Sequence, residues 1–400
     1  MTKNSIQARR RLAFKLASVF LGLVITLLVL ELLVRFLTDV KPPLLLLDNE
    51  VGRSYAANFD DEIYVAESDR MVRFRTHRDG FRGADVPYQK EKHTYRIAVI
   101  GDSQIAAIAT LEKDTLVRQL ERMLRENHPQ VNWEVLNFGI STSSTAQELV
   151  LYRKLVRNYD PDLVICSYYI GNDFSDNDSA LGSYLRIYMD LDDQGQLYVK
   201  PRPAFRWVSS RWLNRYSRLY VWQKGSFAGM TRKAMQTEPL YKVRSGRLIF
   251  LDQDRPDLLH AWQLNEALIH QFHKEVTEDK REFLFVVVPS NSQIYQNQWD
   301  NFVERATNER QFLDVDFPDR KLGEILDKRN IERIFFREGL RSTEEGQPSA
   351  KPEARISYYQ GSGHMNEDGN RIAASMVYER LVENGSIEAV KETIGAPLHE

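Results

Sequence analysis

Short apolar runs alternate with amphipathic helical segments through most of the chain between residues 94 and 384. Polar residues, glycine or proline bound each run, and the segments between the runs repeat apolar residues every three or four positions. The expected strands are 96–100, 133–138, 162–170, 282–288 and 331–336. The expected helices are 113–126, 145–158, 257–278 and 370–383. Strands that alternate with helices predict an α/β fold, with a parallel sheet covered by helices on both faces.

The N-terminus holds one long apolar stretch, residues 16–37, whose only charges are Glu31 and Arg35. At about 1.5 Å per residue, a helix of this length crosses a hydrocarbon core of about 30 Å. No small-residue cleavage site lies near its end, which favours an uncleaved signal anchor over a signal peptide. A buried helix of a soluble protein is the alternative, but such helices are rarely apolar on all sides. Glu31 and Arg35 are spaced to pair on one face.

The orientation follows from the flanking charges. Residues 1–15 carry five basic residues and no acid, so the positive-inside rule places this flank in the cytoplasm. We therefore expect a single-pass protein of the inner (cytoplasmic) membrane whose later residues face the periplasm. Residues 38–93 show no long period and predict a membrane-proximal connector, which Pro42 and Pro43 separate from the helix. Residues 385–400 are interpreted as a C-terminal tail.

Composition excludes several classes of protein. The net charge is -2, from 54 basic and 56 acidic residues, which argues against a nucleic-acid binder. The one cysteine, Cys166, excludes intrachain disulfides and multi-cysteine metal sites. Neither a phosphate-binding loop nor a dinucleotide fingerprint is present. We therefore expect no cofactor and no metal ion.

Polar motifs follow several of the expected strands. The first strand ends in Gly-Asp-Ser at 101–103, the second in Asn-Phe-Gly at 137–139 and the third in Gly-Asn-Asp at 171–173. A Gly-His-Met-Asn sequence at 363–366 precedes the last helix. Ligand sites of open parallel sheets lie beyond the carboxyl ends of the strands, so we expect these motifs to meet at one edge of the sheet.

In these motifs the chain resembles the SGNH (GDSL-type) hydrolase superfamily, as a membrane-anchored bacterial member. The four signature residues of that family match Ser103, Gly139, Asn172 and His364, in the family's order. The resemblance covers about residues 94–384, except for an insertion at about 180–255. It implies a three-layer α/β/α domain with a parallel flavodoxin-like sheet.

The resemblance also implies a role for each signature residue. Ser103 is the expected nucleophile and His364 the base that takes its proton. The backbone N–H groups of Ser103 and Gly139 and the side-chain amide of Asn172 are the expected oxyanion donors. Taken singly, these residues have ordinary interpretations as a helix cap, a turn glycine, a strand-end turn and a loop histidine. Together, in the right order, they favour a catalytic site.

One departure from the family concerns the acid that orients the histidine. The family usually carries it two or three residues before the histidine, where this chain has Ser362 and Gly361. Ser362, Glu367, Asp368 or a backbone carbonyl are the candidates for the orienting group. Asn366 is interpreted as the cap of the last helix. Without an acid, a catalytically silent binding or scaffold protein of an envelope polysaccharide assembly remains an alternative.

The insertion is strongly basic and aromatic. Residues 200–250 hold twelve Lys and Arg and a single acid, Glu238. Arg211, Arg215, Arg218 and Trp212 are the candidates for contact with a membrane surface or another polyanion. A membrane surface, an acidic glycan and a solvated helical cap packed on the core are the three interpretations. An insertion after the third strand is also placed to form a lid or a wall of the site.

These observations predict a membrane-anchored, extracytoplasmic serine ester hydrolase or carbohydrate O-acyltransferase. The expected substrate is an ester-bearing glycan or lipid of the cell envelope, and proteins of envelope biosynthesis are the expected partners. The sequence leaves open whether water or a sugar hydroxyl accepts the acyl group.

Overall fold

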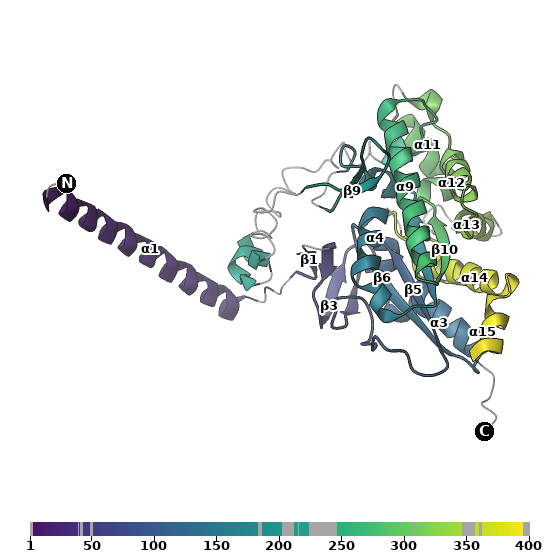
Figure 1. Cartoon of the computed structure of the whole chain (residues 1–400), viewed down its shortest axis with the longest axis horizontal. Coiled ribbons are helices and arrows are strands. Elements are labelled where there is room, and N and C mark those ends of the chain that lie inside the picture. The colour runs from purple at the N-terminus through teal and green to yellow at the C-terminus, as the bar shows by residue number, and fades with distance from the viewer. Residues whose placement is uncertain are drawn as a thin grey trace. The chain divides into compact units, whose positions relative to one another are not determined.

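A computed structural model describes most of the 400 residues (Figure 1). The described residues are 3–38, 40, 43–48, 51–182, 186–201, 212–214, 216–223, 246–306, 309–345, 357–359 and 362–394. The contacts divide the chain into two compact units. One combines Met1–Leu47 with Pro203–Glu238, and the other combines Asp48–Arg202 with Pro239–Glu400.

The N-terminal helix α1 spans Lys3–Leu37 (Figure 1). The most apolar stretch of 18 residues within Arg10–Leu37 has a mean hydropathy of 2.6, and Arg10–Leu37 is long enough to cross a membrane. The side chains of this part are almost all exposed, unlike those of a core helix. The predicted pairing inside it is confirmed, since Arg35 Nε lies 2.8 Å from Glu31 Oε1.

The second unit is built on a parallel sheet of five strands. In chain order these are β5 (Thr94–Gly101), β6 (Asn132–Gly139), β7 (Leu163–Tyr169), β10 (Glu282–Val288) and β11 (Arg333–Phe335). Their order across the sheet is β11-β10-β7-β5-β6, and every neighbouring pair is parallel. The predicted α/β fold with a flavodoxin-like parallel sheet is confirmed. Residues of β5 and β7 are buried along their whole length, as expected for strands covered on both faces.

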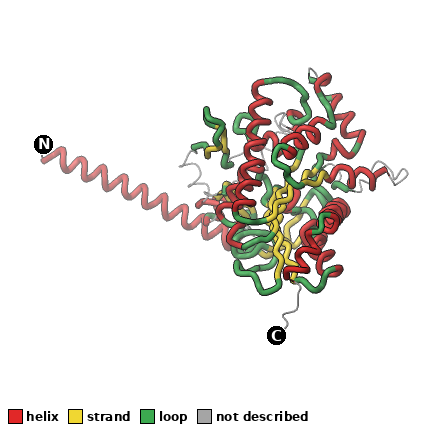
Figure 2. Tube along the Cα trace, turned by 45° about the vertical axis from the view of Figure 1, so that its right-hand side comes forward, coloured by secondary structure: helices red, strands yellow, loops and turns green. Residues whose placement is uncertain are grey.

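Helices cover both faces of the sheet (Figure 2). The longer ones are α3 (Leu116–Asn127), α4 (Thr145–Lys154), α9 (Pro256–Glu278), α11 (Gln296–Glu304), α12 (Phe317–Asp327), α13 (Phe336–Glu345), α14 (Glu367–Glu383) and α15 (Ser386–Ile394). The short ones are α2 (Ser103–Ala106), α5 (Asp173–Asn177) and α10 (Asn291–Ile294), and 3-10 turns span Glu112–Asp114, Val156–Tyr159 and Arg310–Phe312. Apolar residues of α3, α13 and α14 form one core with the sheet, and α4, α5 and α9 pack together. Helix α15, within the expected tail, adds Ile387 and Val390 to that core.

The expected connector contains regular structure. It holds the short strands β1 (Leu45–Asp48) and β2 (Gly52–Tyr55), and β3 (Asp60–Val65) forms an antiparallel hairpin with β4 (Arg70–Arg75). Strand β4 buries Val72 and Phe74, whereas Met71, Arg73 and Arg75 are exposed, so the alternation defines its buried face. These strands have four to six residues each, too few to show a clear period in the sequence. Part of the expected insertion also forms a hairpin, from β8 (Met189–Leu191) and β9 (Leu197–Val199).

Candidate active site

The serine motif lies where β5 turns into the short helix α2. Asp102 is the N-cap of α2, and its Oδ1 accepts the N–H of Gln104 at 2.8 Å. Ser103 is the first residue of α2. The first N–H groups of a helix have no partner inside it, so the Ser103 N–H points outward from the helix start. A strand end followed by a capped helix start therefore holds the serine.

The histidine motif meets the serine from the other end of the chain. His364 Nε2 lies 2.8 Å from Ser103 Oγ, although 261 residues separate them. Gln104 holds the histidine loop on both sides: its Nε2 donates to Gly363 O at 2.7 Å, and its Oε1 accepts the N–H of Met365 at 3.1 Å. Because Gln104 follows Ser103 directly, this clamp fixes the distance between the hydroxyl and the imidazole.

The second ring nitrogen of His364 faces an acid that the sequence analysis missed. His364 Nδ1 lies 2.8 Å and 3.0 Å from the two carboxylate oxygens of Glu67. A carboxylate only accepts hydrogen bonds, so Nδ1 carries the proton and the neutral ring presents Nε2 as an acceptor. That tautomer accepts the proton of Ser103.

Glu67 lies in the turn between β3 and β4, inside the expected connector. Arg70, at the start of β4, fastens this hairpin to the site: it donates to Ala109 O and to the Tyr359 hydroxyl, each at 3.0 Å. Arg70 also forms an ion pair with Glu367 at the start of α14. The Glu67 side chain is 20% exposed and that of His364 is 37% exposed. The acid is therefore partly shielded from water and held by a braced hairpin.

Of the three side chains expected to orient His364, Ser362 contacts the histidine, and Glu367 and Asp368 contact arginines. Ser362 Oγ accepts the backbone N–H of His364 at 2.9 Å and lies 3.4 Å from Nδ1, farther than Glu67. Glu367 pairs with Arg70, and Asp368 lies 3.4 Å from Arg371. Glu367 and Asp368 are in the first turn of α14, where acids also complement the helix dipole. Ser362 therefore supports the histidine loop, and Glu67, rather than Glu367 or Asp368, is the acid placed beside Nδ1.

Two of the three expected oxyanion donors are hydrogen-bonded within the protein. The Gly139 N–H donates to Asn137 Oδ1 at 2.9 Å. The Asn172 amide donates to Asp176 Oδ2 at 2.9 Å and to Asp173 Oδ1 at 3.3 Å. Gly139 has a packing role here, because a Cβ on it would lie 2.3 Å from the backbone nitrogen of Ala106 in α2. The close approach of β6 to α2 accounts for this glycine.

A cavity of about 170 Å³ opens beside Ser103 and His364. Its described lining is Val65, Glu67, Ser103, Gln104, Ala107, Ile108, Ala109, Thr110, Ser141, His364 and Met365. Much of that lining is apolar. The described residues 180–182, 186–201 and 246–255 of the expected insertion do not contribute to it.

Ser141 brings a second hydroxyl into this cavity. The Ser141 N–H donates to the hydroxyl of Tyr55 at 2.9 Å, and that hydroxyl lies 2.8 Å from Ser141 Oγ. Tyr55 is 2% exposed, and burial raises the pKa of its hydroxyl to about 12, so it stays protonated. When the Tyr55 hydroxyl donates to Ser141 Oγ, the Ser141 hydroxyl proton is free to point into the cavity.

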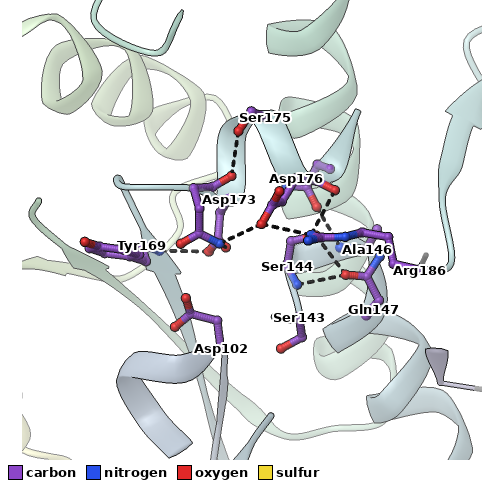
Figure 3. Close-up of polar contacts among 12 residues, drawn as sticks. Asp102, Ser143, Ser144, Ala146, Gln147, Tyr169, Asp173, Ser175, Asp176 and Arg186 are labelled. Atoms are coloured by element: carbon purple, nitrogen blue, oxygen red, sulfur yellow. Dashed lines mark hydrogen bonds and ion pairs between the residues drawn. The ribbon is translucent and has the colours of Figure 1, made fainter. Parts of the chain in front are cut away.

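A buried group of acids lies behind the serine. Figure 3 shows Asp102 with Asp173 and Asp176, and with Arg186, whose Nη1 lies 3.0 Å from Asp176 Oδ2. Burial raises the pKa of Asp102 to about 6, opposed by the N–H of Gln104 and by the nearby His364. Burial also raises the pKa of Asp173 well above its usual range, and the neighbouring Asp102 adds to the effect. Asp102 and Asp173 therefore hold their protons more tightly in the folded protein than in the unfolded chain.

We expect the stability of the protein to depend on pH through Asp102. The pKa of this carboxyl rises from 3.8 to about 6 on folding, so its stabilising contribution is complete below the lower value and is lost as pH rises through the upper one. In Asp102→Asn, which keeps an acceptor for the Gln104 N–H, the free energy of unfolding should decline less over that interval. Urea unfolding of the two proteins at a series of pH values measures this. Parallel curves would contradict it.

No metal site emerges from the described residues. Among them, no three His, Cys, Asp or Glu side chains are grouped so as to hold a metal ion. Cys166 is buried in β7, and burial raises the pKa of its thiol well above its usual range. Its environment is that of an inert core residue.

Comparisons with known proteins give distant structural similarities. No protein-family model matches the chain, and no curated protein matches it. Its structure is similar to that of an acetyl xylan esterase at 10% identity, covering 72% of this chain and 99% of the other, with a TM-score of 0.39. It is also similar to an acetyl xylan esterase from Geobacillus stearothermophilus at 13% identity, covering 72% of this chain and 94% of the other, with a TM-score of 0.38. A G-D-S-L family protein from Desulfitobacterium hafniense is similar at 9% identity, covering 71% of this chain and 98% of the other, with a TM-score of 0.35. These TM-scores are below 0.5, and the similarities assign no substrate to this chain.

Proposed function

We propose that the chain is a serine ester hydrolase or O-acyltransferase that works through an acyl-serine intermediate. The observation that carries the proposal is the continuous relay from Ser103 Oγ to His364 Nε2 and from His364 Nδ1 to Glu67, with each contact at 2.8 Å. A serine hydroxyl is a weak nucleophile until a base takes its proton, and the base needs a partner that stabilises its charged form. The relay supplies both.

In the proposed reaction, Ser103 Oγ attacks the ester carbonyl while His364 Nε2 takes the hydroxyl proton. The imidazolium, stabilised by Glu67, returns that proton to the leaving alcohol when the C–O bond breaks. Water or a sugar hydroxyl then attacks the acyl-serine, with His364 again acting as the base. The final collapse releases the acid or the new ester and restores Ser103.

Donors for the developing oxyanion come from the helix start and the neighbouring loop. We assign this role to the Ser103 N–H and to the Ser141 hydroxyl, which borders the same cavity. Asn172 acts here only if its amide leaves Asp176 or Asp173, and Gly139 only if its N–H leaves Asn137. Each well-placed donor contributes about 3 to 4 kcal/mol to lowering the barrier.

The cavity favours a short acyl group. Its volume of about 170 Å³ is below the range of about 300 to 1,000 Å³ that is typical of sites for larger ligands. Ala107, Ile108 and Ala109 supply an apolar wall for an acyl chain, and the alcohol part would extend into solvent. We propose that helix α1 anchors the protein in the inner membrane, and that the substrate is a short-chain ester on an envelope glycan or lipid facing the periplasm.

The alternative of a silent scaffold rested on the missing acid. Glu67 now occupies the place of that acid beside His364 Nδ1. The absence of an orienting acid, on which the scaffold alternative depended, therefore does not hold for the described site.

A fluorophosphonate probe tests the proposal. The full-length wild-type protein should form a covalent adduct, and the labelled peptide should contain Ser103. Ser141→Ala should still form the adduct on Ser103, but more slowly, because it removes one proposed oxyanion donor and keeps the contact between Ser103 and His364. Ser103→Ala should form no adduct. Folded wild-type protein that stays unlabelled would favour the scaffold.

A further inference from the structure

The two charges of helix α1 bind a second segment of the chain. Glu31 Oε2 accepts the Ser217 hydroxyl at 2.8 Å and the Leu219 N–H at 3.0 Å, and Glu31 Oε1 accepts the Arg218 N–H at 2.8 Å. Arg35 donates from Nε to Glu31 and from Nη2 to Tyr216 O at 2.6 Å. The partner segment, residues 212–214 and 216–223, belongs to the basic insertion and is mainly helical. We call it the docked segment.

These contacts have the form of a helix cap supplied by another helix. The first N–H groups of a helix lack partners inside it, and an acidic side chain placed there satisfies them and complements the helix dipole. Ser217 Oγ meanwhile accepts the N–H of Tyr220 at 3.0 Å, as an ordinary capping serine does. Glu31 thus receives four hydrogen bonds, two from backbone N–H groups, one from Ser217 and one from Arg35.

The need for this cap follows from where Glu31 lies along α1. A hydrocarbon core of about 30 Å accommodates about twenty helical residues, so a span that starts near Leu16 ends near Arg35. Glu31 lies one helical turn before Arg35, so it is still inside the hydrocarbon core, close to its periplasmic boundary. A carboxylate there is costly unless its oxygens are hydrogen-bonded and its charge is paired. The docked segment and Arg35 supply both conditions.

The exposed side chains of the docked segment suit the same depth. Trp212, Tyr216 and Trp222 are 61%, 52% and 45% exposed, and the rings of Trp212 and Tyr216 are 5.8 Å apart. Trp and Tyr concentrate at membrane–water interfaces, where the ring meets acyl chains and the polar atom meets water. Arg218, on the same segment, is a cation suited to lipid phosphate. The other two candidate contact residues, Arg211 and Arg215, lie outside the described residues.

We propose that the docked segment lies in the outer headgroup region of the bilayer, fastened to α1 by Glu31 and Arg35, with its exposed aromatic side chains among the lipids. This inference rests on the proposed membrane anchoring by α1. Glu31, a charged residue inside a membrane span, then has the role of binding the basic insertion. The insertion then holds the chain to the membrane at a second place, independently of residues 38–47.

Depth-dependent quenching by brominated lipids tests this inference on the full-length protein in phosphatidylglycerol-containing vesicles. We expect lipids brominated near the ester carbonyls to quench tryptophan fluorescence, and the variant with Trp212→Phe and Trp222→Phe to lose most of that quenching. Glu31→Ala should show the same loss, because the cap is removed. Thr26→Ala is the matched control on α1, since among the described residues its hydroxyl donates to Gly22 O of the same helix, and it should quench like wild type.

Resistance to alkaline carbonate separates this inference from the anchoring on which it rests. If carbonate extracts wild-type protein from the vesicles, the anchoring itself is wrong. If wild-type and Glu31→Ala proteins both resist carbonate and are quenched equally, the anchor stands and the docking by Glu31 is refuted. If a soluble acidic glycan removes the quenching while the protein stays in the vesicles, the segment binds glycan rather than lipid, which also overturns the inference.

Discussion

Glu67→Gln should lower kcat for an activated ester by about 10³- to 10⁴-fold, the size of effect seen when an orienting carboxylate is replaced by an amide. The carboxylate accepts the Nδ1 proton of His364 and leaves Nε2 free to accept from Ser103. An amide in the same place also offers N–H donors, which favour the tautomer with its proton on Nε2. That tautomer cannot take the proton of Ser103, and the imidazolium loses its counter-charge.

The readout is steady-state kinetics of the full-length protein. We expect kcat to fall with little change in KM. Glu67 acts mainly on His364, and its contribution to ester binding is limited to its place in the cavity lining. Glu62→Gln is the control, since it removes an exposed acid from the same hairpin. Glu67→Asp should recover part of the activity by restoring a carboxylate. Equal activity of wild type and Glu67→Gln would show that the hairpin acid has no part in the reaction.

Gly139→Ala should destabilise the protein by about 3 kcal/mol and reduce its activity. The added Cβ would lie 2.3 Å from Ala106 N, 2.6 Å from Ile105 C and 2.9 Å from Ala106 Cα. All three are backbone atoms, so no rotamer change relieves the contact, and α2 must shift from β6. Because α2 carries Ser103, this shift would also lengthen the contact between Ser103 and His364.

Unfolding monitored by near-UV circular dichroism measures the stability change. Gly323→Ala is the matched control, because nothing lies within 4 Å of its added Cβ and the residue is in helix α12. A glycine in a helix interior costs about 0.5 to 1 kcal/mol relative to alanine, so this control should be neutral or stabilising. Equal stability of the two variants would contradict the packing role assigned to Gly139.

The sheet was predictable because its strands are buried on both faces. A strand such as β10 (Glu282–Val288) reads as one apolar run, and the crossover helices between such runs fix parallel pairing. Ser103 and His364 were predictable because each belongs to a short motif. The motif of Ser103 lies at the end of a strand, and that of His364 lies just before a helix. Gln104, Tyr55 and Ser141 contribute to the site through hydrogen bonds that no periodic pattern reports.

Glu67 could not be found by the same reasoning. It reaches His364 across 297 residues of sequence, from a hairpin whose strands have six residues each. The family places its acid near the histidine in sequence, whereas Glu67 comes from the expected connector. An acid in a short alternating hairpin, followed by an arginine that can brace it, was the available signal. In that hairpin Val72 and Phe74 alternate with Arg73 and Arg75, a pattern typical of a strand with one buried face.

The acyl-serine intermediate tests the central claim most directly. Wild-type protein would be mixed with an activated acetyl ester, quenched in acid within the first turnovers and digested for peptide mass spectrometry. We predict one acetyl group on the peptide that contains Ser103, and none on that peptide in Ser103→Ala. Turnover of the ester by wild-type protein with no acetyl group on Ser103, or with the group on another residue, would contradict the account.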